Sequence, residues 1–218
     1  MKRNTVNTKV QFGYPGRRSP EGRNRTIERL RERPRILIVC EGEKTEPNYF
    51  RAFRVTNNVF GEGLETIRVV EEAERLNEVD GPFDRIWCVF DRDSFPADNF
   101  DNAVKKVLSL ASKGFRVAYS NEAFELWYIL HFEYQDAALP RASYWPRLTG
   151  HIGRDYRKGD PDIYSVLHSK GNEELAHKYA QRLREHHAED LPLSRRNPQT
   201  TVDELVRYLR DVQRERGF

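Results

Sequence analysis

Two short, largely apolar runs most constrain the fold of this chain, because acidic residues follow each of them directly. The first run, ILIVC at residues 36–40, is followed by Glu41, and the second, RIWCVF at residues 85–90, is followed by Asp91. Runs of β-branched and other apolar residues without polar alternation are typical of strands buried on both faces of a parallel sheet. We therefore expect an α/β fold whose carboxylates gather at the carboxyl edge of the sheet.

The segments around these runs alternate between strand and helix patterns. We expect a mainly parallel sheet of about four strands flanked by helices, followed by a C-terminal helical part. Further strands are expected at residues 66–70 and 115–119, and helices at residues 45–55, 98–113, 123–132, 172–189 and 201–214. The helix at 123–132 is apolar around nearly its whole circumference, so we expect it to be buried.

Positive charge is concentrated in the N-terminal segment. Residues 1–34 contain 10 Lys and Arg against 3 Asp and Glu, whereas the whole chain has a net charge of +3. Their prolines, glycines and lack of apolar periodicity predict a disordered basic tail. Residues 35–135 are expected to form the α/β core. Residues 136–218 are expected to form a long basic loop, at 139–161, and helices that pack on the core.

Composition argues against the membrane and disulfide-rich classes of protein. The longest aliphatic stretch, at residues 36–40, is much shorter than a membrane span, and the first residues lack the apolar segment of a signal peptide. The two cysteines, Cys40 and Cys88, cannot form a disulfide framework. We therefore expect a cytoplasmic protein without a membrane partner.

The acidic residues after the two runs form a candidate metal site. Asp91 and Asp93 would point to the same side of an extended strand end, so one cation could contact both. Glu41, after the other run, is the third candidate ligand. Mg²⁺ prefers carboxylate oxygens, and Mn²⁺ accepts the same ligands. The alternative is that these acids cap helices, and for Glu46 a helix-dipole role and a supporting role in the site are equally open.

The buried helix contributes one further candidate residue. Glu125 lies among apolar neighbours, and a buried carboxylate needs a cation or hydrogen-bond donors as partners. Asn121 lies just before this helix and is either its N-cap or a residue that supports the site.

The predicted loop at 139–161 mixes cations with aromatic rings, a combination that can neutralise phosphates and stack on bases. A solvated loop would have the same composition, so both readings stay open. The candidate nucleic-acid contacts in this loop are Arg154, Tyr156, Arg157 and Lys158, and the loop also contains Arg141, Tyr144, Trp145 and Arg147. Candidate phosphate contacts elsewhere are Lys44, Arg195 and Arg196.

These motifs resemble a known family. Glu41-Gly42 after one apolar strand and Asp91-x-Asp93 after a later one resemble the Toprim domain of topoisomerases, bacterial primases and OLD nucleases. Over roughly residues 35–210, the chain more closely resembles the RloB-like family, which includes abortive-infection proteins of the AbiLii type. The segments that carry this resemblance are ILIVCEGEKTEPNYF, CVFDRD, SNEAFELWYILHF, Tyr156-x-Lys158 and NPQTTV from Asn197.

The resemblance implies a Toprim-like nuclease, usually encoded beside an AAA-type ATPase and associated with defence against phage. Glu41 would then be the Toprim glutamate, serving as general acid/base or metal ligand, and Asp91 and Asp93 would hold Mg²⁺. Glu125 falls on a family motif and is a further candidate for the catalytic site. Lys158 could contact the scissile phosphate. Expected partners are DNA or transfer RNA and an ATPase, and the alternative is a non-catalytic nucleic-acid-binding or regulatory subunit.

Overall fold

A five-stranded sheet forms the centre of this computed structural model, which describes residues 33–61, 63–92 and 97–217. The first four strands run parallel and the last pairs antiparallel to its neighbour. In sheet order they are β2 (Val59–Gly61), β1 (Ile36–Cys40), β3 (Arg85–Asp91), β4 (Phe115–Asn121) and β5 (Gln199–Thr200). The predicted α/β class with a mainly parallel sheet is confirmed. Residues 1–32 of the predicted basic tail lie outside the described residues.

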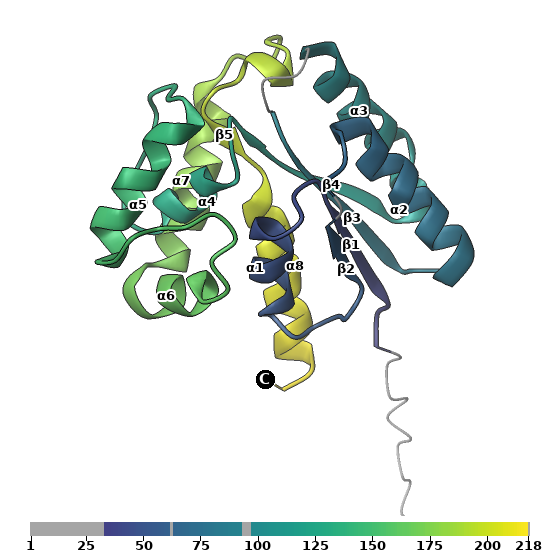
Figure 1. The fold of residues 1–218 in the computed structure, drawn as a ribbon. Coiled ribbons are helices and arrows are strands. Elements are labelled where there is room, and N and C mark those ends of the chain that lie inside the picture. The colour runs from purple at the N-terminus through teal and green to yellow at the C-terminus, as the bar shows by residue number, and fades with distance from the viewer. Residues whose placement is uncertain (1–32, 62, 93–96, 218) are drawn as a thin grey trace, which may run out of the picture. The chain divides into compact units, whose positions relative to one another are not determined.

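Helices cover both faces of the sheet (Figure 1). Those on one face are α2 (Thr66–Asp80) and α3 (Ala97–Ser109). The others are α1 (Thr45–Arg51), α4 (Glu125–Leu130), α5 (Tyr144–Ile152), α6 (Ile163–Lys170), α7 (Glu173–His186) and α8 (Val202–Glu215). Short 3-10 turns are η1 (Ala111–Lys113), η2 (Arg141–Ser143) and η3 (Leu193–Arg195). In the described part of the chain, no helix has both the length and the apolar character needed to cross a membrane.

The continuous apolar character of β1 follows from its burial on both faces. Leu37 and Val39 pack into the cluster formed with α2 and α3. Ile36 and Ile38 belong to the other cluster, which contains buried side chains of α1 and of α4 to α8. Because successive side chains of a strand point to opposite faces, a strand between two helical layers needs an apolar residue at every position.

The segment expected as a second strand at residues 66–70 is instead the start of α2, and this prediction was wrong. Its buried residues include Val69, Val70, Ala73 and Leu76, whose spacing places them on one face of a helix. The strand that pairs with β1 is β2, which has three residues and is too short for alternation to reveal it.

The segment expected as a long loop at residues 139–161 contains α5, so this expectation was also wrong. Tyr144, Leu148 and Ile152 are its buried residues, one on each successive turn. Pro146 lies in the first turn, where a helix does not need its missing N–H group. Pro146 and Gly150 therefore gave the sequence the appearance of a loop although the buried face is helical.

Candidate carboxylate site

The two acids that follow the apolar runs meet at the carboxyl edge of the sheet. The backbone N–H of Glu41 donates to the carbonyl of Val89, which extends the pairing of β1 with β3 by one residue. The Glu41 carboxylate then accepts a hydrogen bond from the backbone N–H of Asp91 at 2.9 Å. Its other oxygen accepts a hydrogen bond at 3.4 Å from the hydroxyl of Thr66, which is the first residue of α2. The parallel sheet thus brings together residues that lie fifty positions apart.

Asp91, the last residue of β3, connects the carboxyl edge of the sheet to two other segments. One of them follows β4 and the other precedes α5. The Oδ2 atom of Asp91 accepts from the backbone N–H of Phe124 at 3.1 Å and lies 3.4 Å from the Arg141 guanidinium in η2. The carboxylate is nevertheless buried. It is therefore held by a backbone donor on one side and a cation on the other.

Two more buried carboxylates lie nearby, Glu46 on α1 and Glu125 at the start of α4. Glu125 accepts a hydrogen bond from the Tyr156 hydroxyl at 3.1 Å. Among the described residues, the Oε2 atom of Glu46 has no hydrogen-bond partner although it is buried. An unpaired buried carboxylate oxygen is costly for a folded protein, and a bound cation is one partner that would offset this cost.

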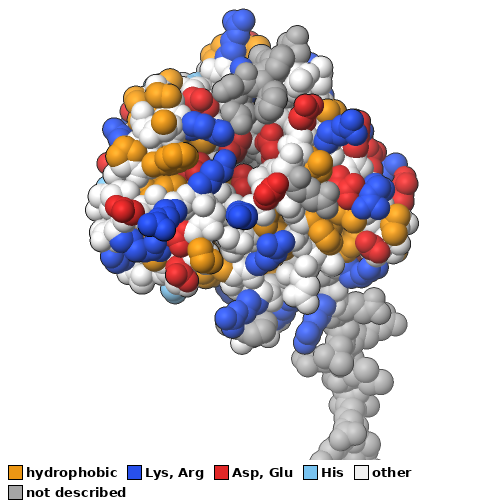
Figure 2. Space-filling view, in the orientation of Figure 1, with side chains coloured by type: hydrophobic (Ala, Val, Ile, Leu, Met, Phe, Trp, Pro, Cys, Tyr) orange, Lys and Arg blue, Asp and Glu red, His pale blue; other side chains and the backbone are white. Residues whose placement is uncertain are grey.

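These side chains surround a cavity of about 210 Å³. Its walls combine acidic side chains with two cations, and the residues that line it include Glu41, Glu46, Glu65, Asp91, Arg141 and Lys158. On the face drawn in Figure 2, acidic side chains lie in a recess with Lys and Arg side chains beside it. The cavity can thus receive a cation and an anion together.

The crowding of carboxylates changes their proton affinity. Burial raises the pKa of Asp91 well above its ordinary value, and the charges of Glu46, Glu125 and Glu41 raise it further, while Arg141 opposes the rise. Burial also raises the pKa of Glu46, and Glu125 adds to this effect while a backbone hydrogen bond and Lys158 oppose it. A cation bound among these groups would relieve both the burial cost and the repulsion.

Glu46→Gln is therefore expected to raise the melting temperature of the metal-free protein at pH 8 and to have little effect near pH 4. The pKa of Glu46 is higher in the folded than in the unfolded chain, so its protonated form favours folding and this contribution is lost as the pH rises. Thermal unfolding across this pH range measures the effect, with exposed Glu43→Gln as the control. A lower melting temperature of Glu46→Gln at pH 8 would contradict this expectation.

The donor set fits a hard cation that uses few protein ligands. Within the described ranges, no group of three or more His, Cys, Asp or Glu side chains is placed to hold a metal ion by itself. Mg²⁺ typically binds one or two carboxylates and completes its shell with water and substrate phosphate. Glu41 and Asp91 supply such a pair, and Glu46, whose Oε2 atom is unpaired, lines the same cavity. The third predicted ligand, Asp93, lies outside the described residues.

Lys158 lies on the wall of the cavity, as a phosphate-binding role requires. The next residue, Gly159, has a φ of 76°, a left-handed conformation that side chains other than glycine rarely adopt. Its carbonyl accepts a hydrogen bond from the Asn48 side chain of α1 at 2.9 Å. A Cβ atom at Gly159 would also crowd the side chain of Lys44, which is exposed beside this turn.

The other three residues of the segment 139–161 that were predicted to contact nucleic acid differ in their burial and in their partners. Tyr156 was expected to stack on bases, but the residue is only 8% exposed and its hydroxyl donates a hydrogen bond to Glu125, so it supports that carboxylate. Arg154 forms an ion pair with Asp160 at 2.6 Å. Arg157 is exposed.

Three predicted residues lie away from the cavity wall. The buried Asn121 side chain donates to the carbonyls of Leu193 and Ser194, at 3.4 and 3.2 Å, and so anchors η3. Arg196 donates to the carbonyls of Leu191 and Glu189 and stabilises a turn. Arg195 is exposed on η3.

Sequence reasoning missed two groups that touch the carboxylates. A strand at residues 66–70 would not bring the Thr66 hydroxyl to Glu41, whereas the start of α2 does. Arg141 was one of several cations in a presumed loop, and nothing in the sequence distinguished it from Arg147, which pairs with Glu133. The N-terminal position of Thr66 on α2 would have been visible had the helical spacing been recognised.

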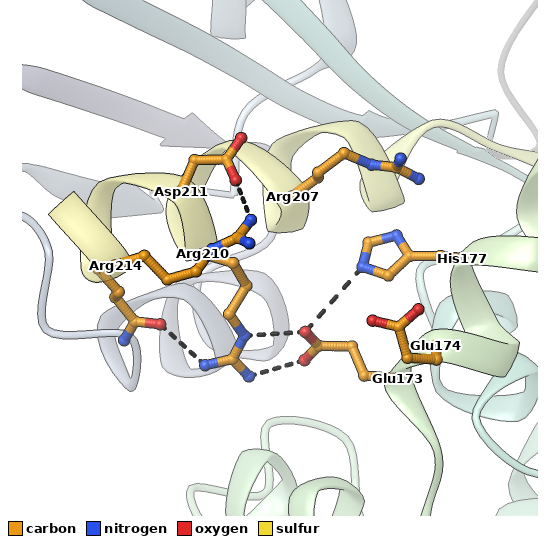
Figure 3. A pocket seen from close by; sticks show the side chains of 8 residues that line it. Glu173, Glu174, His177, Arg207, Arg210, Asp211 and Arg214 are labelled. Atoms are coloured by element: carbon orange, nitrogen blue, oxygen red, sulfur yellow. Dashed lines mark hydrogen bonds and ion pairs between the residues drawn. The ribbon is translucent and has the colours of Figure 1, made fainter.

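A larger cavity of about 510 Å³ lies between α7 and α8, and several of its charged side chains pair with one another (Figure 3). Arg210 forms two hydrogen bonds with Glu173, at 2.8 and 2.7 Å, and Arg214 pairs with Asp211. Arg210 also lies over the ring of Phe53, near the end of α1. These contacts connect α7, α8 and the segment after α1, so we regard this region as structural.

Comparison with known proteins agrees with the motifs. Residues 36–209 match the family described as RloB-like protein, and this range contains the residues that line the carboxylate cavity and the five strands of the described residues. No curated protein and no solved structure matches the chain. Since the match covers most of its length, the chain belongs to the RloB-like family.

Proposed function

We propose that this chain is a Mg²⁺-dependent nuclease of the Toprim type that hydrolyses phosphodiester bonds in DNA or transfer RNA. The observation that carries the proposal is the meeting of Glu41 and Asp91 in a cavity that Arg141 and Lys158 also line. The carboxylates can hold a hard metal ion, and the basic side chains beside them can bind a phosphate. This combination suits metal-assisted phosphodiester hydrolysis. The proposal includes action as an effector in phage defence together with a partner ATPase, and this part rests on the RloB-like family resemblance alone.

Each side chain has a separate task in this proposal. Glu41 and Asp91 would hold the ion, and Asp93 is the third ligand proposed from the sequence. Mg²⁺, when bound, supplies the charge that activates water and offsets negative charge developing on the phosphate. Arg141 and Lys158 bind and orient the phosphate oxygens.

Neighbouring groups keep the reacting side chains in position. The Thr66 hydroxyl and the Asp91 backbone N–H fix the two oxygens of Glu41. The Tyr156 hydroxyl fixes Glu125, which is the further catalytic candidate of the site. Such supporting hydrogen bonds reduce the reorganisation needed when substrate binds.

Glu41→Gln and Asp91→Asn are each expected to lower the rate of metal-dependent cleavage by at least about 100-fold, because each removes a negative ligand without changing shape. Cleavage of labelled plasmid, single-stranded DNA and total transfer RNA is measured with Mg²⁺ or Mn²⁺. The matched control is Glu71→Gln, which neutralises an exposed carboxylate of α2 and should leave the rate unchanged. Thermal unfolding checks that all variants fold.

Two results would contradict the proposal. Cleavage that persists in either site variant would assign the activity to another site or to a contaminant. Absence of cleavage by the native chain, both alone and with the neighbouring ATPase, would instead favour a non-catalytic nucleic-acid-binding or regulatory subunit.

A further inference from the structure

One large aromatic ring is exposed on α5, directly after the η2 turn whose Arg141 lines the carboxylate cavity. Trp145 is 42% exposed, whereas the other tryptophans, Trp87 and Trp127, are 5% and 0% exposed. Tyr144 and Tyr156, which the sequence grouped with Trp145 as possible stacking residues, are both buried. The structure thus leaves one of these three rings available to a ligand.

The position of Trp145 relates it directly to the cavity. It directly follows Tyr144, whose backbone N–H donates to the carbonyl of Arg141, so Trp145 lies about one helical turn along the chain from Arg141. Arg141 in turn lies 3.4 Å from the Asp91 carboxylate. Burial raises the pKa of Tyr144, and Glu122, Glu125 and Asp91 raise it further, as expected where the start of α5 lies near these carboxylates.

The surroundings of Trp145 favour a polyanion over an apolar protein partner. The other exposed large hydrophobic side chains of the described residues, Val79 and Leu108, are on α2 and α3, which cover the opposite face of the sheet. No other exposed large hydrophobic side chain of the described residues therefore lies on the same side of the sheet as Trp145. Arg141, four residues before Trp145 in the chain, is a cation that lines the cavity together with Lys158. Figure 2 shows hydrophobic surface and Lys and Arg side chains side by side on this face.

We infer that Trp145 stacks on an unpaired base of a single-stranded nucleic acid whose neighbouring phosphate lies in the carboxylate cavity. This inference rests on the proposed function and adds the substrate class, a single-stranded or locally unpaired polynucleotide. An exposed indole ring offers a face to any base, and cations next to it neutralise the backbone. Bases inside a duplex are covered by their neighbours, so they do not offer that face.

Tryptophan fluorescence tests the inference without requiring cleavage. The full chain is titrated, with a chelator present, with oligothymidylate, oligouridylate, an abasic oligonucleotide of equal length and a duplex. The two single strands are expected to quench the fluorescence, because Trp145 is the exposed emitter. The abasic strand and the duplex are expected to quench little. Comparison of the thymidylate and uridylate affinities identifies DNA or RNA as the preferred strand.

Variants then separate stacking from charge. Trp145→Ala is expected to weaken single-strand binding roughly 5- to 100-fold, the range for the loss of one stacked base. Trp145→Phe keeps a ring, so it should retain most of the affinity while losing the quench. Leu108→Ala, which removes an exposed side chain of α3, is the matched control and should bind as the native chain does.

The results also distinguish this inference from the proposed nuclease activity. Unchanged affinity in Trp145→Ala, or equal quenching by the abasic strand or the duplex, would overturn the stacking role even if the chain cleaves nucleic acid. Base-dependent quenching that Trp145→Phe removes would support it even if no cleavage is found.

Discussion

Gly61→Ala is expected to destabilise the protein by about 3 kcal/mol or more, since overpacking against rigid backbone has no easy relaxation. A Cβ atom at this position of β2 would overlap the carbonyl oxygen of Gly42 and the Cγ atom of Pro47. Neither obstacle is the flexible end of a side chain. Either β2 must separate from β1, or the loop that carries Glu41 must move.

Thermal and denaturant unfolding measure this effect, and for a chain of this size a loss of about 3 kcal/mol corresponds to roughly 6–12 °C in melting temperature. The matched control is Gly150→Ala on α5, where an added Cβ meets no atom within 4 Å. It should stabilise the protein by about 0.5–1 kcal/mol, because alanine is the better helix former. Similar melting temperatures for the two variants would show that β2 has room to adjust.

The second large effect is expected from Arg184→Met, which should lower stability by about 3–5 kcal/mol by leaving a buried charge without its partner. Arg184 on α7 forms two hydrogen bonds with Asp203 on α8, at 2.5 and 2.9 Å, and a third with the Thr200 carbonyl at 2.7 Å. Asp203 is fully buried. The guanidinium therefore joins α7, α8 and the edge strand β5.

A double variant separates loss of the ion pair from loss of packing. Arg184→Met with Asp203→Leu removes both charges, so it should recover most of the stability lost in the single variant. Equilibrium unfolding of the native chain, the two single variants and the double variant gives the coupling between them. If the double variant is as unstable as the sum of the single changes, the buried charge is not the cause.

The central strands could be predicted because their sequence signal is strong and local. Burial on both faces makes β1 and β3 continuous apolar runs, and the acids directly after them mark the carboxyl edge. The edge strands could not be predicted, since β2 and β5 have three and two residues. For α2, the valines at 69 and 70 suggested a strand locally, whereas the buried face is apparent only over the whole helix.

The sequence identified Glu41 and Asp91 because their positions follow from strand ends alone. The partners of these acids come from distant segments, such as Arg141 at 50 positions from Asp91 and Tyr156 at 31 positions from Glu125. No local pattern encodes such contacts, because they depend on how α4 and α5 pack. The assignment of catalytic and metal roles stays a prediction that the cleavage experiment tests.

The shortness of the edge strands has a consequence for the behaviour of this chain at high concentration. An unpaired strand edge presents N–H and C=O groups that can align a strand from another molecule, and this template weakens as the edge becomes shorter. Here β2 offers three residues and β5 two, while the long apolar strands β1 and β3 lie between other strands. The sheet order therefore protects these two apolar strands from edge-to-edge association.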